Sequence, residues 1–319
     1  MNSELAKVQS GLKKFNKIII WGLRKKFHTH RYIHQAYFES FKKLGKEVVW
    51  VEDEVASQKI VQPNDLLFAA EPVGKFVQAK KTISDYALPI RNDVYYCLHN
   101  YQEMFLNELD RGKVLKLQVY LRDKEVFKQL DLDAFFDFDS QTLYQSWATD
   151  LMPWEFKNPI FSSSSFVFWV GSIWNNEQNQ GNQQTIARLN KELGRHKIRF
   201  VNIRFVPSYM NSFLVRHSRL APAVAGEYQV AIDYLPDRYF KNLSYGQLPF
   251  TNVKKINELF GTVELCNSSI EEQVTKLLSM NKQQYLEEIS RQQHICRDHF
   301  TYLQKIRNIS KCFDEIINS

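Results

Sequence analysis

The chain has 319 residues, of which 44% are hydrophobic and 14% aromatic, and this composition excludes an intrinsically disordered protein. Its net charge of +7 and its isoelectric point near 9.0 favour an anionic partner: nucleic acid, an anionic membrane surface or a phosphorylated small molecule. The length predicts two domains of about 150 residues each.

Several classes of protein are excluded by missing patterns. No apolar run approaches the about 20 residues that span a bilayer, and the amino-terminal stretch lacks the apolar core of a secretion signal. We therefore expect a cytoplasmic protein, with peripheral association at the inner face of the membrane left open. The absence of zinc-finger, RNP-like and helix-turn-helix patterns means that no nucleic acid is expected as a partner. Four scattered cysteines predict reduced, mostly buried thiols rather than a zinc site or disulfides: Cys97, Cys266, Cys296 and Cys312.

The first half of the chain begins with a strand, a helix and a second strand. The continuous apolar run at 16–23 is typical of a strand that is buried on both faces. Apolar residues then recur at helical spacing over 29–45, and Gly45 is the predicted end of that helix. With a second strand at 47–53, the three elements form a βαβ unit. The sequence therefore predicts a parallel sheet.

Four more strand-like runs follow, and they favour an open Rossmann-like domain over a sandwich. They lie at 65–70, 93–99, 114–120 and 133–139. A stretch with two prolines and a serine run then marks a change of composition, which predicts a domain boundary within 155–164. We accordingly expect an amino-terminal Rossmann-like domain over 1–158 and a second one over 159–290.

The second half repeats the alternation of strands and helices. The predicted strands lie at 166–172, 198–205, 248–252 and 262–266, and the predicted helices at 184–196, 208–220, 236–246 and 254–261. The tail from 269 to 319 is strongly helical. Two Rossmann-like domains that face each other across a cleft are the simplest architecture, and the fold class is α/β. Ligands bind at the carboxyl ends of the strands in such sheets.

The segment 234–252 carries a candidate phosphate site. Pro236 and Asp237 are residues that begin helices, so free amide groups and the positive end of the helix dipole are expected beside them. Arg238 and Lys241 are three residues apart and share a face, and two cations at a helix start suit a diphosphate. The alternative is an amphipathic helix whose cations are simply solvated.

Three residues further along could recognise a sugar. The side chains of Asn242 and Tyr245 can form hydrogen bonds with a sugar or ribose hydroxyl, and Gly246 allows the backbone to approach a ligand closely. In the alternative interpretation, the apolar side chains of this helix face the core and no ligand is involved.

The order of these motifs carries a resemblance to a known family. The motifs are "VGS", "SRLAPAVAGEYQ", "LPDRYFKNLSYGQLPFTN", "ELFG" and, in the tail, "DHFTYLQKIRNI". Together they resemble bacterial glycosyltransferases of the GT-B fold, particularly the CgeB-like group 1 branch. The resemblance covers 166–310 well, and the first domain only through its pattern and "WATDLMP". The matching positions are Arg238, Phe240, Gly246, His299, Thr301, Tyr302 and Arg307. The Glu-x7-Glu of many retaining GT-B enzymes is absent, so retention or inversion stays open.

The resemblance implies a donor site in the second domain. Gly171 and Ser172 would approach the phosphates of a nucleotide sugar, and Arg238 and Lys241 would neutralise the leaving diphosphate. Thr251 and Asn252 would lie at the next strand end. It also implies that no metal or cofactor is needed, and that the helices over 291–319 return to the first domain.

The first domain would then hold the acceptor, a saccharide or a lipid-linked saccharide. The basic loop after the first strand carries His28 and His30, and a histidine can take a proton from an acceptor hydroxyl near neutral pH. His30 is the first choice because it lies where the loop meets the helix. His99 at a strand end is a second candidate. Each of these histidines is equally well explained as a capping or surface residue.

Two rival interpretations remain. Asp131-x-Asp133 and Asp137-x-Asp139 match the DxD with which GT-A glycosyltransferases hold a divalent cation, although the two-domain alternation argues against that fold. A nucleotide-sugar epimerase of similar fold and a non-catalytic protein that binds phosphate or nucleic acid are the other functions left open.

Overall fold

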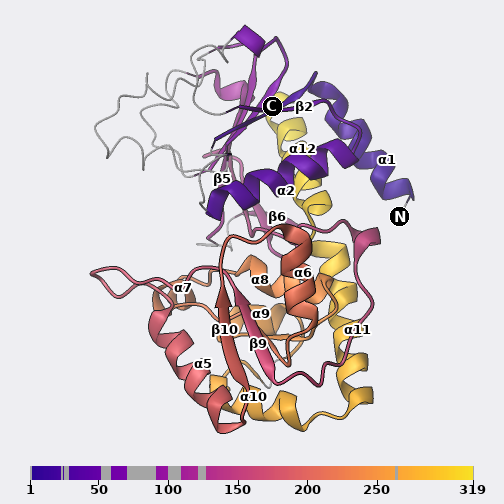
Figure 1. Cartoon of the computed structure of the whole chain (residues 1–319). Coiled ribbons are helices and arrows are strands. Elements are labelled where there is room, and N and C mark those ends of the chain that lie inside the picture. Colours follow the sequence, from indigo (N-terminus) through magenta and orange to yellow (C-terminus); the bar gives the residue numbers. More distant parts are fainter. Residues whose placement is uncertain are drawn as a thin grey trace. The chain divides into compact units, whose positions relative to one another are not determined.

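The computed structural model describes residues 2–22, 24, 29–51, 59–69, 91–99, 109–120, 127–262 and 265–318 (Figure 1). The chain divides into two compact units. Unit 1 comprises Met1–Val119, Asp123–Gln145 and Tyr302–Ser319, and unit 2 comprises Tyr120–Arg122 and Ser146–Thr301. The chain thus leaves unit 1 after Gln145, before the predicted boundary, and returns to it after Thr301.

Unit 1 is built on an eight-stranded sheet with the order β2-β1-β3-β4-β5-β8-β7-β6. The strands are β1 (Ile18–Trp21), β2 (Val48–Val51), β3 (Leu66–Ala69), β4 (Tyr95–His99), β5 (Val114–Gln118), β6 (Lys128–Asp131), β7 (Ala134–Asp137) and β8 (Thr142–Gln145). The first six strands of this order, from β2 to β8, pair in parallel. The pairs β8–β7 and β7–β6 are antiparallel. The predicted α/β class with a parallel sheet is therefore confirmed.

The helices of unit 1 come from both ends of the sequence. In the described ranges of unit 1 they are α1 (Asn2–Gly11), α2 (Thr29–Lys43) and α12 (Tyr302–Asn318), with the short 3-10 turns η1 (Leu12–Lys14) and η4 (Arg111–Lys113). Helix α12 contacts α1, α2, β5 and β8. The ring of Phe313 on α12 lies 5.3 Å from that of Phe15 and 5.5 Å from that of Tyr95, so the last helix completes the core.

A fully buried ion pair joins α12 to the sheet of unit 1. Lys305 Nζ lies 2.7 and 2.6 Å from the two carboxylate oxygens of Asp133, and both side chains are 0% exposed. The neighbouring Arg307 also binds acidic side chains, since its guanidinium contacts Glu4 at 2.6 Å and Asp131 at 3.2 Å. Charged residues of the tail are therefore structural contacts of unit 1.

Unit 2 contains two pairs of parallel strands, β9 with β10 and β11 with β12. The strands are β9 (Phe166–Val170), β10 (Arg199–Ile203), β11 (Ala221–Pro222) and β12 (Pro249–Phe250). The helices are α5 (Gln183–Arg195), α6 (Ser208–Arg216), α7 (Glu227–Ala231), α8 (Asp237–Ser244), α9 (Lys254–Leu259), α10 (Ile270–Ser279) and α11 (Lys282–His299), with the 3-10 turn η6 (Pro153–Glu155). The predicted strand at 262–266 has no described residue in a strand: 262 is loop and 265–266 form a turn, while 263–264 lie outside the described residues.

The core of unit 2 is rich in stacked aromatic rings. Phe240 of α8 stacks on Phe300 with 4.3 Å between ring centroids, and Phe260 lies 5.2 Å from Phe300. Tyr239 beside Phe240 is also buried. Because α8 directs these rings into the core, its charged residues are left on the other side, as expected for an amphipathic helix.

Buried tyrosines make the stability of the protein sensitive to alkaline pH. Burial raises the pKa of Tyr96 and of Tyr285 from 10.0 to about 12. Their contribution to stability is complete below pH 10, the unfolded pKa, and is lost as pH rises towards the folded pKa. Each shift corresponds to about 2.7 kcal/mol. We expect the free energy of unfolding, followed by circular dichroism, to fall between pH 10 and pH 12 together with the appearance of tyrosinate absorbance. Tyrosinate appearing in the fully folded protein near pH 10 at all buried positions would contradict this.

Candidate functional site

The carboxyl end of β9 has a glycine that no other residue could replace without strain. Gly171 adopts a φ of 144° and its amide donates to Ile203 O at 2.9 Å, which keeps it in register with the end of β10. A Cβ atom at this position would lie 2.5 Å from Nη2 of Arg238. Glycine is therefore needed both for its backbone angle and for the close approach of an arginine.

Arg238 is held against the end of β9 by two contacts. It lies in the first turn of α8, and its Nη1 donates to Val170 O at 2.6 Å. Its guanidinium carbon lies 3.7 Å from the ring centroid of Trp169, a cation–π contact. Burial lowers the pKa of Arg238 to about 10, so the side chain stays protonated at neutral pH. A fixed, partly buried positive charge therefore adjoins Gly171.

A second arginine reaches the same strand end. Arg204 follows β10 directly, and its Nη2 lies 3.2 Å from the hydroxyl oxygen of Ser172. Arg204 is not among the residues predicted from the sequence, although its position after a strand was visible there. The carboxyl ends of parallel strands lie at one edge of a sheet, so a cation just after β10 belongs beside the residues just after β9.

Lys241 lies one turn after Asp237 on α8 and is paired with it. Lys241 Nζ is 2.5 Å from the carboxylate of Asp237, and the two side chains are 18% and 29% exposed. Burial lowers the pKa of Lys241, but the carboxylates of Asp237 and Asp150 outweigh this effect and the net shift is upward. Lys241 is therefore charged, and its charge is already balanced within the protein.

Three predicted donor residues bind the backbone around β11. Asn242 Nδ2 donates to Ala221 O at 3.0 Å, and Thr251 Oγ1 donates to Ala223 O at 3.0 Å. Asn252 accepts from the amide of Ala225 at 2.8 Å and donates to its carbonyl at 2.9 Å. These side chains fix the loop that follows β11 rather than converging with Gly171 and Ser172.

Tyr245 and Gly246 contact the segment that enters unit 2. The hydroxyl of Tyr245 lies 2.7 and 2.9 Å from the two carboxylate oxygens of Asp150, and its ring is 1% exposed. Gly246 has a φ of 88°, and a Cβ there would lie 2.3 Å from Asn158 O. Both residues are therefore accounted for by packing within unit 2.

Comparison with known proteins does not assign the chain to a family. The chain matches no model of a known protein family, and a search of curated proteins finds no significant match. Within the part of the chain that the structure describes, none of the helices has the length and apolar content needed to cross a bilayer.

The candidate histidines of unit 1 occupy different positions. His30 lies in the first turn of α2, and His28 lies outside the described residues. His99 ends β4 and is 3% exposed. His34, one turn further along α2 than His30, is fully buried against Gly22, where a Cβ would lie 2.3 Å from the imidazole.

Three of the four aspartates of the DxD patterns have side-chain partners in unit 1. Asp133 and Asp131 pair with Lys305 and Arg307, and Asp137 accepts a hydrogen bond from the hydroxyl of Ser140. In the described ranges, no group of three His, Cys, Asp or Glu side chains is placed to hold a metal ion.

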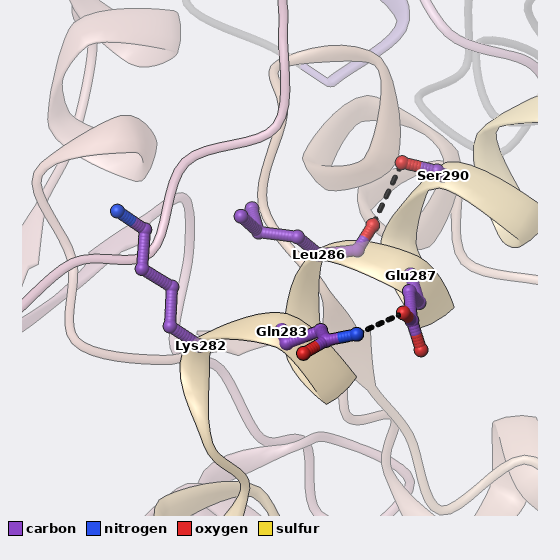
Figure 2. Close-up of a pocket in the computed structure, with 5 residues that line it drawn as sticks. All are labelled: Lys282, Gln283, Leu286, Glu287 and Ser290. Carbon is purple, nitrogen blue, oxygen red and sulfur yellow. Dashed lines mark hydrogen bonds between the residues drawn. The ribbon is translucent and has the colours of Figure 1, made fainter.

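A shallow depression of about 720 Å³ lies elsewhere on unit 2, along α11 (Figure 2). Its lining side chains all come from this one helix, and two pairs bond within it: Gln283 Nε2 donates to Glu287 at 2.9 Å and Ser290 Oγ to Leu286 O at 2.7 Å. Among the described residues, only α11 lines the depression, and none of the residues discussed in the preceding paragraphs is part of its lining. The end of β9 is therefore the stronger candidate site.

Proposed function

We propose that the protein is a metal-independent glycosyltransferase of GT-B architecture, a hexosyl- or deoxyhexosyltransferase. Unit 2 binds a nucleotide-diphosphate sugar at the end of β9, and unit 1 binds a saccharide or glycolipid acceptor. One observation carries the proposal: at the carboxyl end of β9, Arg238 bonds Val170 O beside Gly171, and Arg204, just after β10, bonds the hydroxyl of Ser172. Anionic ligands bind at such strand ends.

The chemistry of donor cleavage explains why two arginines are useful there. When the glycosidic bond breaks, negative charge builds up on the leaving diphosphate, so fixed cations stabilise the transition state more than the ground state. Guanidinium groups match phosphate oxygens in a planar, bidentate geometry. The contacts of Arg238 with Trp169 and Val170 hold its side chain in place before the donor arrives.

The acceptor hydroxyl must lose a proton in the same reaction. If the configuration inverts, a base from unit 1 takes it, and His30 is the first choice, ahead of His28 and His99. A histidine suits this role because its ordinary pKa lies near neutral pH.

Two alternative functions would also place a phosphate ligand beside these arginines, and each can be distinguished from a transferase by experiment. A nucleotide-sugar epimerase would convert the donor without any acceptor, so incubation with donor alone separates it from a transferase. A non-catalytic phosphate or nucleic-acid binder would bind without turnover, and its affinity would fall steeply with salt. Two arginines at one strand end favour a compact phosphate ligand over a polymer.

A panel of nucleoside diphosphates tests the proposal directly. A diphosphate that occupies unit 2 at a hundred times its dissociation constant should add about 2.7 kcal/mol to the free energy of unfolding and raise the melting temperature. The matching nucleosides without phosphate are the control, and they should shift it little. Unchanged melting temperatures with every diphosphate would contradict the proposal.

A further inference from the structure

Exposed aromatic side chains gather around helix α6 of unit 2. Tyr209 is 75% exposed, Phe213 57% and Met210 39%, and Phe205, just before the helix, is 49% exposed. These four are among eleven exposed large hydrophobic residues in the described part of the chain, yet they lie within nine positions. Such clustering is unusual, because exposed apolar side chains are normally scattered singly.

The geometry of α6 places its aromatic residues on the outer side. Tyr209 and Phe213 are four residues apart and share one face. The opposite face is anchored, since Val215 is buried and belongs to the core cluster with Ala221 and Tyr245. The helix also contacts β9. We refer to Tyr209, Met210 and Phe213 as the aromatic face of α6.

Phe205 is held in place beside this face at a cost. Its φ is 60°, a left-handed conformation that a bulky residue rarely adopts. The guanidinium of Arg204 lies 4.8 Å from its ring centroid. A strained backbone that presents an exposed ring beside an arginine indicates a position used for binding.

The stretch of sequence that contains α6 carries charged side chains of one sign. From Gly194 to Gly226 the sequence contains no Asp or Glu. The basic residues of this stretch are Arg195, Lys197, Arg199, Arg204, Arg216 and Arg219. Of these, Arg199 and Arg204 are exposed on or next to β10. Arg204, next to Phe205, is therefore the basic residue that adjoins the exposed rings, and the acid-free stretch favours an anionic partner.

We propose that the aromatic face of α6 docks unit 2 onto an anionic lipid bilayer. Tyrosine and phenylalanine rings with a methionine on one side of an anchored helix suit the headgroup region, where apolar and polar groups meet. The exposed arginines add attraction to anionic headgroups. A single-stranded nucleic acid would also use aromatic rings beside cations, but the sequence lacks the patterns of nucleic-acid-binding folds, and a second copy of the chain would carry the same positive charge. The bilayer therefore fits both observations best.

Vesicle sedimentation tests this docking. We expect the full chain to bind vesicles of phosphatidylcholine with phosphatidylglycerol, and to bind much less to phosphatidylcholine alone or at high salt. The double variant Tyr209→Ser/Phe213→Ser should reduce binding about tenfold, because affinity follows the apolar area buried in the interface. The matched control is Tyr228→Ser on α7, a tyrosine of the same unit that is 43% exposed, and it should bind like the wild type.

Several outcomes would overturn the proposal. The proposal is wrong if the full chain does not bind anionic vesicles, or if the double variant binds them as well as the wild type. It is also wrong if Tyr228→Ser loses as much vesicle binding as the double variant. A concentration-dependent dimer in light scattering that disappears in the double variant, without vesicle binding, would assign the face to a second copy. Binding to single-stranded nucleic acid that the double variant loses, again without vesicle binding, would assign it to nucleic acid. Melting temperatures equal to that of the wild type show that the variants are folded. Because the vesicle assay does not depend on enzymatic activity, a negative result would not contradict the proposed transferase function.

Discussion

Replacing Asp133 with alanine is expected to lower the free energy of unfolding by about 3–5 kcal/mol. The substitution would leave the ammonium group of Lys305 buried without its carboxylate, in a place where both side chains are 0% exposed. The lost pairing matters more than the lost packing, because an uncompensated buried charge has no water to solvate it. Urea unfolding followed by circular dichroism measures the change.

Two matched variants separate charge from packing. The double variant Asp133→Leu/Lys305→Met removes both charges at once, and it should recover most of the stability. The variant Lys128→Ala removes the exposed pair with Glu315, whose side chains are 60% and 30% exposed, and should change stability by less than about 1 kcal/mol. A small effect of Asp133→Ala, or a double variant no more stable than the single one, would show that the pair is not isolated from water.

The variant Arg238→Ala is expected to lower turnover of a nucleotide sugar at least about 100-fold, which corresponds to about 2.7 kcal/mol of transition-state stabilisation. It should also abolish the rise in melting temperature caused by nucleoside diphosphates. The reason is the position of Arg238, which contacts Val170 and Trp169 and adjoins Gly171. Steady-state kinetics and thermal unfolding measure the two effects.

Two control variants separate the position of Arg238 from its positive charge. One keeps a positive charge at residue 238, and the other removes an arginine elsewhere in unit 2. Arg238→Lys keeps the positive charge but loses the planar contact with Trp169, so we expect an intermediate effect. Arg188→Ala removes an exposed arginine of the same unit that pairs with Glu271, and it should leave turnover unchanged. If Arg238→Ala keeps the full diphosphate response, the arginine serves only to anchor α8 on β9, and the proposed donor site is wrong.

The strands of unit 1 could be predicted because burial on both faces leaves a clear pattern. The runs at β1 and β3 are apolar at every position, and all four residues of each are buried. The strands β6 and β8 were not predicted, because their sequences are polar or mixed. A polar residue at a sheet position carries no local signal, and these strands are identified by their partners: β7 for β6, and β5 and β7 for β8.

The candidate site was predicted in part, and the rest depended on contacts between distant residues. Gly171, Ser172 and Arg238 were selected from strand-end and helix-start patterns, and the structure brings these three together. The hydrogen bonds of Asn252 and Tyr245 to residues far away in sequence could not be read from any spacing. Hydrogen-bonding side chains look the same in sequence whether they bind a ligand or the backbone.

Completion of unit 1 by α12 has a consequence for synthesis on the ribosome. Residues 1–145 leave the ribosome long before Tyr302–Ser319. Until then the sheet of unit 1 cannot complete its core, because the rings of Phe15 and Tyr95 lack their contact with Phe313. Unit 2 is contiguous apart from Tyr120–Arg122 and can be finished earlier, which reverses the usual order in which amino-terminal domains fold first. Nascent chains would therefore present an unfinished apolar surface to chaperones until Tyr302–Ser319 has been synthesised.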